Sequence, residues 1–189
     1  IISACVEQLL ALDVGTAVFA LWKSDSTPTL LMESVFVLEC LAPEKWNADR
    51  FLPPTPIRIV INHRGNPELG KDGRFIAMPN TLRNGPAHLI PDFTEIRGLI
   101  QPMAQASESL ASKQASELKQ FAIDMMHEKL SREIQRLESL AKVNATIRQE
   151  ELSLLRKEQL NLGNSLDQAF FRLDSIRLIW KGDMERLKN

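Results

Sequence analysis

One segment of the sequence has the spacing of a phosphate-binding loop. Residues 65–72 read Gly-Asn-Pro-Glu-Leu-Gly-Lys-Asp, which fits G-x-x-x-x-G-K and follows a strand-like run. A nucleotide site of this kind needs Ser or Thr after the lysine, to hold magnesium, and then a helix whose N–H groups face the phosphates. Here Asp72 follows the lysine, and Gly73 and Pro79 leave no room for a helix. Because Glu68 also adds negative charge, we predict a hairpin turn at this segment and not a nucleotide site.

The histidines and cysteines are scattered along the chain. His63, His88 and His127 lack the local spacing of metal ligands, and we expect them at the surface or in turns. Cys5 and Cys40 fall on apolar faces, without a base or an orienting group nearby in sequence. We therefore predict that they are small buried hydrophobic residues and not nucleophiles. Two cysteines are also too few for a disulfide scaffold or a four-ligand zinc site.

Paired carboxylates occur at Glu150 and Glu151, beside Arg148. Adjacent helix positions point apart, so we expect a solvated charged face and not an acid–base couple. The chain has no tyrosine, and its Phe and Trp residues sit within apolar stripes, which argues against an RNA-stacking platform. From the residues alone we expect no catalytic, cofactor-binding or metal-binding residue, and the partner-binding residues stay open.

The composition is that of an ordinary globular protein of one domain, or at most two small ones. The 189 residues are 44% hydrophobic and 25% charged, and 23 basic against 24 acidic side chains leave a net charge of −1. Both signs are spread evenly, which argues against a basic nucleic-acid clamp and an acidic disordered tail. No apolar run approaches the roughly 18 residues of a membrane span. The start at Ile1 suggests a piece of a longer chain, and no signal peptide is visible.

The N-terminal part of the chain alternates strand and turn signals. Residues 1–13 place apolar side chains at helical spacing and predict a helix. Residues 17–22 and 29–41 are strand-like runs joined by a turn with Pro28, and we predict that they pair as a hairpin. Residues 42–56 form a connector whose prolines favour a stiff, extended path.

Turn residues become frequent after this connector. The next segments are expected to be, in order, a strand, a turn, a return strand and a loop: residues 57–62, 64–73, 74–78 and 79–91. Residues 92–100 predict a short helix that Gly98 and Pro102 limit.

The composition then changes to a stretch without Gly or Pro, from Ala104 to Asn161. Its first part carries an apolar stripe at helical spacing, made of Leu118, Phe121, Met125, Leu130, Ile134, Leu137 and Ala141. A break is expected at residues 143–145, and Thr146 to Gln149 fits a capping box that starts a second helix.

The second helix has an apolar stripe near heptad spacing, made of Ile147, Leu154 or Leu155, Leu162, Leu166, Phe170 and Leu173. Gly163-Asn164 is expected to bend or break it, at a cost of about 1 kcal/mol relative to alanine, and residues 165–168 offer a restart box. Residues 175–181 alternate again and predict a last strand that returns to the N-terminal sheet.

Together these elements predict an α+β fold, with a small, mainly antiparallel sheet, an N-terminal helix and a long antiparallel helical pair. We expect a single domain over residues 1–189, with a sheet-rich base at 1–103 and 174–182 and a helical hairpin at 104–173. One helix over 104–143 would be about 60 Å long, against roughly 40 Å for a compact domain of this size. Either the hairpin projects as a contact arm or the first helix is interrupted. We favour two helices that lie across the sheet.

Four strings of the sequence are recognisable. They are Asp-Arg-Phe-Leu-Pro-Pro-Thr-Pro-Ile-Arg at 49–58, the helical 129–138 with the turn at Asn144, Asn-Ser-Leu-Asp-Gln at 164–168, and Phe-Arg-Leu-Asp-Ser-Ile-Arg-Leu-Ile at 171–179. Together they resemble the family of C-terminal domains of RapA (also called HepA), the bacterial RNA polymerase-associated ATPase of the SWI/SNF type. The resemblance covers nearly the whole chain in the same order and is weakest between Asn66 and Pro91.

The resemblance implies a large cytoplasmic parent protein, a helicase-like translocase that binds RNA polymerase and helps to recycle polymerase trapped on DNA. In that family ATP, magnesium and DNA belong to two RecA-like motor lobes with a true phosphate loop and a DEAD/DEAH-like box. This chain has neither motif, so no catalytic residue carries over, and the fragment itself is not expected to be an enzyme. The implied role is accessory: contact with RNA polymerase, packing on the motor lobes, or both.

Three other roles stay open. The chain could be a plain structural cap on the motor lobes, or a DNA-contacting arm, against which its near-neutral charge argues. A free-standing enzyme would need a convergent pocket with perturbed titratable groups. No membrane partner is expected.

Overall fold

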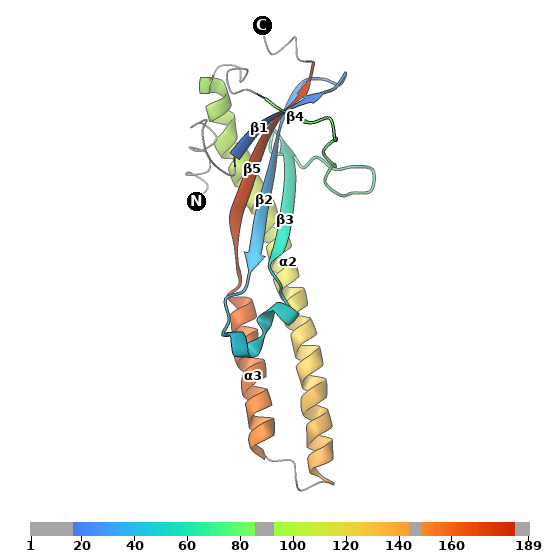
Figure 1. Cartoon of the computed structure of the whole chain (residues 1–189), viewed down its shortest axis with the longest axis vertical. Helices are drawn as coiled ribbons and strands as arrows, with labels where there is room; N and C mark the ends of the chain where they lie inside the picture. The colour runs from blue at the N-terminus through green and yellow to red at the C-terminus, as the bar shows by residue number, and fades with distance from the viewer. Residues whose placement is uncertain (1–16, 86–92, 144–148, 184–189) are drawn as a thin grey trace. The chain divides into compact units, whose positions relative to one another are not determined.

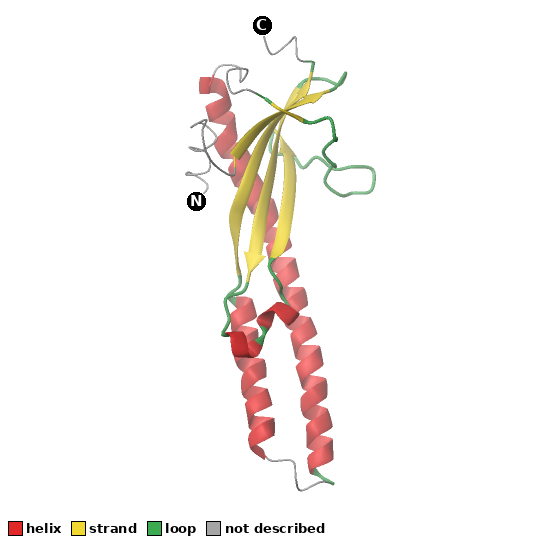
Figure 2. Cartoon of the chain, viewed as in Figure 1, coloured by secondary structure: helices red, strands yellow, loops and turns green. Residues whose placement is uncertain are grey.

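The computed structural model describes residues 17–85, 93–143 and 149–183. One sheet and two long helices make up most of it (Figure 1, Figure 2), which confirms the predicted α+β class. In chain order the elements are β1 (Ala17–Lys23), β2 (Thr29–Glu39), η1 (Glu44–Trp46), η2 (Ala48–Arg50), β3 (Thr55–Asn62), β4 (Arg83–Asn84), α2 (Phe93–Ala141), α3 (Gln149–Asp167) and β5 (Phe170–Gly182). The helix predicted over residues 1–13 lies outside the described residues. None of the described helices has the length and apolarity that a membrane crossing requires.

The chain divides into two compact units. Unit 1 comprises Ile1–Val37, Pro56–Lys113 and Arg172–Asn189, and unit 2 comprises Leu38–Thr55 and Gln114–Phe171. Unit 1 therefore holds nearly all of the sheet and the first part of α2. Unit 2 holds the connector with η1 and η2, the second part of α2, and α3.

The sheet of unit 1 has five strands in the order β3-β2-β5-β1-β4. β1 and β5 pair in parallel, from Ala17 opposite Ile176 to Lys23 opposite Gly182. β1 pairs with β4 in the antiparallel sense, so the sheet is mixed.

The last strand takes an inner place in this sheet. The strand predicted over 175–181 and its return to the N-terminal sheet are confirmed. The predicted hairpin of 17–22 and 29–41 is wrong, because β5 lies between β1 and β2. Leu178 and Ile179 point to opposite faces of β5, and each is at most 1% exposed. β5 is therefore buried on both of its faces.

Both faces of the sheet are covered within unit 1. On one face, further apolar side chains pack over a buried cluster, and the set consists of Ala20, Leu31 and Ile179 with Trp22, Ile76, Met78 and Leu82. The first part of α2 runs along the other face (Figure 2), and its buried side chains share one face of the helix: Ile100, Met103, Ala104, Ser107 and Ala111. β2 is therefore buried on both faces, although its sequence indicated one drier face.

Helix α2 is one unbroken helix of 49 residues. A short helix was predicted over 92–100, limited by Gly98 and Pro102. Its predicted C-terminal limit is wrong, because the chain stays helical through both residues. Pro102 removes one backbone hydrogen bond, but its neighbours Ile100 and Met103 are 1% and 0% exposed. Their burial stabilises the helix by more than the missing bond costs.

In unit 2 the second part of α2 packs beside α3. Three polar contacts show that residue numbers rise along α2 as they fall along α3, namely Lys119 with the carbonyl of Asp167, Ser131 with Gln159, and Glu138 with Arg156. The break predicted at 143–145 agrees with the end of α2. Most of the capping box predicted at 146–149 lies outside the described residues.

The buried stripe of α2 in unit 2 differs from the predicted one. Its buried members are Ala115, Ala122, Met126, Leu130 and Ile134. Phe121 and Met125, which the predicted stripe included, are 65% and 44% exposed. The predicted stripe contained a step of five residues between Met125 and Leu130, and such a step crosses from one helix face to the next. Two neighbouring faces were therefore merged into one.

Helix α3 is also unbroken. The break predicted as one outcome at Gly163-Asn164 and the restart at Ser165 are wrong, because the helix continues through both. A Cβ atom on Gly163 would lie 3.3 Å from the Cε atom of Met126, so this glycine allows α3 to approach α2 closely. The Oγ atom of Ser165 donates to the carbonyl oxygen of Asn161 at 3.1 Å, within the same helix.

Candidate functional site

The segment with phosphate-loop spacing begins with a turn at the end of β3, as predicted. The Oδ1 atom of Asn62 accepts the backbone N–H groups of Arg64 and Asn66, at 2.9 and 3.2 Å, and the Asn62 carbonyl accepts that of Gly65. Gly65 has a φ of 77°, a left-handed conformation that glycine adopts without strain. These N–H groups are therefore engaged within the turn itself.

The return strand predicted at 74–78 is wrong. The segment forms an isolated bridge between Leu69 and Phe75 and then continues without regular structure. Ile76 and Met78 pack over the buried cluster of the sheet instead of extending it. Apolar burial, and not strand pairing, holds this part of the chain.

The two described histidines belong to different units, and each makes one polar contact at a modest distance. The Nδ1 atom of His63 is 3.2 Å from the Oγ1 of Thr29, and the Nδ1 atom of His127 is 3.4 Å from the Nε2 of Gln159. His127 is exposed, as predicted. His88 lies outside the described residues. Each contact joins two elements of the same unit.

Cys40 is half-buried just after β2, and its thiol donates to the carbonyl oxygen of Ser165 at 3.3 Å. Burial raises the pKa of the Cys40 thiol, and the negative charge of Asp49 raises it further. A raised pKa lowers the fraction of thiolate, which is the nucleophilic form. This environment suits the unreactive role predicted for Cys40, and Cys5 lies outside the described residues.

The remaining candidates are the paired carboxylates and possible metal ligands. Glu150 and Glu151 are exposed in the first turn of α3, which confirms the predicted solvated face. Over residues 17–85, 93–143 and 149–183, His, Cys, Asp and Glu side chains form no group of three that could hold a metal ion.

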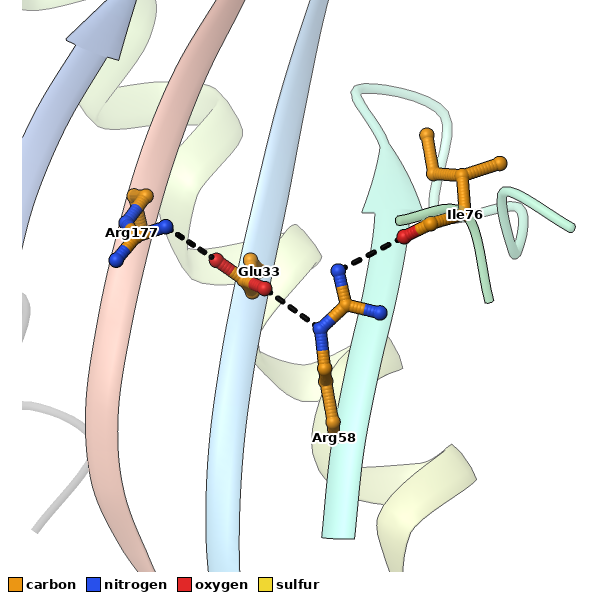
Figure 3. Close-up of polar contacts among 4 residues, drawn as sticks. All are labelled: Glu33, Arg58, Ile76 and Arg177. Carbon is orange, nitrogen blue, oxygen red and sulfur yellow. Dashed lines mark hydrogen bonds and ion pairs between the residues drawn. The ribbon is translucent and has the colours of Figure 1, made fainter. Parts of the chain in front are cut away.

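Three charged side chains that sequence reasoning did not connect meet on the sheet of unit 1 (Figure 3). Glu33 of β2 lies between Arg58 of β3 and Arg177 of β5. Its Oε1 atom accepts the Nε of Arg58 at 2.6 Å, and its Oε2 accepts the Nη1 of Arg177 at 3.1 Å. The Nη2 of Arg58 also donates to the carbonyl oxygen of Ile76 at 2.8 Å.

This network fixes the sheet and leaves no open carboxylate. The Glu33 side chain is 11% exposed, and each of its oxygens has an arginine partner. Charge-assisted contacts of this kind offset the cost of placing a carboxylate where little water reaches it. A signal was present in the sequence, because Arg58 and Arg177 both interrupt apolar strands and a cation at such a position needs an anionic neighbour.

The connector of unit 2 packs on the helical pair. η1 and η2 cross the pair near the C-terminal end of α3 (Figure 1), and Leu52 after them is 4% exposed. Arg50 pairs with Glu158 of α3 at 2.6 Å, and the Nζ of Lys129 on α2 lies 5.8 Å from the centre of the Phe51 ring. The connector thus contacts both helices, where the sequence predicted a stiff extended path.

The same unit leaves large apolar side chains in water. On its two helices these include Phe121, Met125, Leu140 and Leu154. A hollow along α2 is lined by Met125, Glu128, Lys129, Arg132, Glu133 and Arg136. Apolar surface with a charged rim is typical of a protein interaction site. The helical pair is therefore the candidate contact surface of the chain.

Comparison with known protein families gives a match over almost the whole chain. A family model described as RNA polymerase recycling family C-terminal covers residues 1–181 of the 189. The matched range includes residues of both units, so it contains the Glu33 network and the helical pair. It also contains the strings at 49–58 and 171–179 that carried the resemblance.

Proposed function

Because the chain belongs to the RNA polymerase recycling family, as a C-terminal domain of the RapA type, we propose that it contacts RNA polymerase as an accessory domain of a polymerase-recycling ATPase. In this role it supplies contact surface, while the motor lobes of the parent protein hydrolyse ATP. The parent acts in the cytoplasm as a SWI/SNF-type translocase, and this domain packs on its lobes as well.

The exposed apolar side chains of the helical pair carry the proposal. Leu154 and Phe121 are each 65% exposed. Burying such side chains against a partner contributes about 1.5–3 kcal/mol for each that becomes fully buried. Charged residues around them favour a partner protein over a lipid surface.

The chemistry of ATP belongs to the parent in this proposal. The segment at 65–72 engages its N–H groups within a turn, and Asp72 stands where a magnesium-binding hydroxyl would be needed. ATP, magnesium and DNA would therefore be held by the motor lobes, and the domain would act on recycling through contact.

The test is a binding measurement with purified RNA polymerase core enzyme. The labelled chain is titrated with polymerase, and the parent protein with and without this domain is compared in multi-round transcription. We expect the chain to bind polymerase and the truncated parent to recycle it less well. A truncated parent that keeps full recycling but unfolds at a lower temperature would show a structural cap instead. Salt-dependent binding of the chain to duplex DNA would show a DNA-contacting arm.

A further inference from the structure

The connector of unit 2 shows how the helical pair holds a short segment. Arg50 and Phe51 are adjacent in the connector, and each contacts a charged residue of a different helix. The Nη2 of Arg50 pairs with the Oε1 of Glu158 on α3 at 2.6 Å, and the Phe51 ring lies 5.8 Å from the Nζ of Lys129 on α2. An acidic residue of one helix and a basic residue of the other therefore hold a basic–aromatic pair. We call Lys129 and Glu158 the first clamp.

The same two charges recur two helical turns away from the first clamp, toward the end of α2. Arg136 lies seven residues after Lys129, and Glu151 lies seven residues before Glu158. A shift of seven residues returns to nearly the same helix face, and opposite shifts on the two helices lead to the same level of the pair. Arg136 and Glu151 are both exposed, and neither forms an ion pair with another described residue. We call them the second clamp.

The apolar floor between the helices repeats with the same spacing. Near the first clamp, Leu130 and Leu162 are 1% and 0% exposed. Seven residues further toward the second clamp, Leu137 and Leu155 occupy the equivalent positions and are half-buried. The apolar surface between the helices therefore continues from the first clamp to the second. Its side chains are more exposed at the second clamp, where the connector does not cover them.

Two more leucines widen this floor. Leu140 and Leu154 are 40% and 65% exposed, and Leu154 lies one turn from Glu158 on the same face of α3. Figure 1 shows that η1 and η2 cross the pair near the C-terminal end of α3, and that the rest of this face is not crossed by them. The second clamp and its leucines thus form a binding surface that the connector does not fill.

We propose that the second clamp and its floor bind a segment of RNA polymerase that carries a basic residue beside an aromatic one. The proposal rests on the proposed function, because it names the surface through which the chain contacts polymerase. Charge complementarity determines the orientation of the bound segment. Its basic residue pairs with Glu151, and its aromatic ring lies against the Arg136 guanidinium. The filled first clamp shows that the helical pair accepts this chemistry.

Two other occupants fit the surface less well. A nucleic acid would bring phosphates close to the carboxylates of Glu133 and Glu151, whose repulsion opposes the attraction of Arg136. A second copy of the chain could not offer its Arg50–Phe51 pair, because its own first clamp already holds that pair. It could offer only the adjacent Lys45–Trp46 pair of η1, in which the Lys45 ammonium lies over its own Trp46 ring.

A peptide with the connector sequence tests the chemistry of the second clamp. The peptide spans Asn47 to Pro54, which leaves Arg50–Phe51 as its basic–aromatic pair, and it is titrated with a fluorescent label into the full chain while its anisotropy is recorded. We expect Glu151→Arg in the chain to weaken binding about tenfold, and Arg50→Glu in the peptide to restore binding to that variant. The matched control is Glu150→Arg, which lies on a neighbouring face and should change little. Absence of peptide binding, or equal affinity for the chain and its Glu151→Arg variant, would overturn the proposal.

Two leucines of equal exposure test the polymerase contact in the full chain. Leu154 and Leu160 are both 65% exposed on α3, but only Leu154 shares the face of the second clamp. We expect Leu154→Asp to weaken polymerase binding about tenfold or more, and Leu160→Asp to leave it unchanged. Equal effects of the two changes, or a chain that dimerises through Leu154 and does not bind polymerase there, would overturn the proposal.

The two experiments separate two kinds of failure. If the wild-type chain does not bind polymerase, the proposed function fails and the polymerase partner fails with it. The peptide titration then still decides whether the second clamp holds a basic–aromatic pair. If the chain binds polymerase but Leu154→Asp binds equally well, the proposed function stands and this surface is the wrong one.

Discussion

Unit 1 and unit 2 differ in how they use their charged side chains. In unit 1, both carboxylate oxygens of Glu33 are bonded to arginines of neighbouring strands. In unit 2, Glu158 pairs with the connector, whereas the equivalent Glu151 pairs with no described residue. The sheet thus satisfies its inner charge from its own strands, and the helical pair leaves one set of charges and leucines for a partner.

The architecture explains this difference. An inner strand has a neighbour on each side, so a charge such as Glu33 finds partners within the sheet. Two helices meet along one seam, and the face beside the seam is covered only where another segment crosses it. In unit 2 that segment is the connector, which crosses the pair near one end of α3. A covered face holds the fold, and an uncovered apolar face is available for binding.

The largest expected effect comes from two leucines at equivalent positions of α3. Leu162 is fully buried, and Leu155 is half-buried seven residues away. We expect Leu162→Ala to lower the free energy of unfolding by about 2.7–5 kcal/mol, because it leaves a cavity in a closed core. Leu155→Ala should cost clearly less, and Leu160→Ala, at a 65% exposed position, within about 0.5 kcal/mol. Urea unfolding measures all three; equal costs at positions 162 and 155 would contradict a half-covered pair.

The next effect concerns the charge network of unit 1. Glu33→Gln keeps the shape of the side chain but removes the charge that Arg58 and Arg177 share. We expect a loss of about 2–3 kcal/mol in the free energy of unfolding, because hydrogen bonds to charged groups are lost and two guanidinium groups remain nearby. The matched change Glu108→Gln, at an exposed position of α2 in the same unit, should cost less than about 0.5 kcal/mol. A neutral Glu33→Gln in urea unfolding would show that the network contributes little to the sheet.

The smallest effect concerns the thiol of unit 2. Burial and the Asp49 carboxylate raise the pKa of Cys40, so the folded chain favours the protonated thiol. The associated stability is present below the ordinary thiol pKa and is lost as the pH rises through the raised value. Alkylation of Cys40 at mildly alkaline pH should be slow, and Asp49→Asn should speed it by lowering the pKa. Mass spectrometry of the Cys40 peptide measures the rate, with Glu44→Gln as the control; no change with Asp49→Asn would contradict this account.

Local patterns predicted single elements well and pairings poorly. The alternation of 57–62 and 175–181 predicted two strands, because a half-buried strand leaves a period of two in its own sequence. The pairing of 17–22 with 29–41 was predicted from nearness along the chain, which ignores the insertion of β5. Gly98 and Pro102 were read as helix limits from local propensity, which the burial of their neighbours overrides.

The candidate contact surface was harder to predict than the fold. The predicted stripe of α2 included Phe121 and Met125 as core residues, although both face water. Helical periodicity shows that a side chain lies on a face but does not show what covers that face. The first clamp could not be predicted from local patterns, because Arg50 and Glu158 are 108 positions apart in the chain.

The sequence by itself determined the four longer strands, the presence of two helices with a break between them, and the strings that carried the family resemblance. These are local properties, set by spacing, turn residues and short motifs within one element. Tertiary structure alone decided that β5 lies between β1 and β2, that Glu33 meets two arginines, and that the connector fills one clamp and leaves its equivalent open. Each of these features depends on contacts between segments that are distant in the sequence. Which surface buries which is a property of the whole fold and leaves no local pattern.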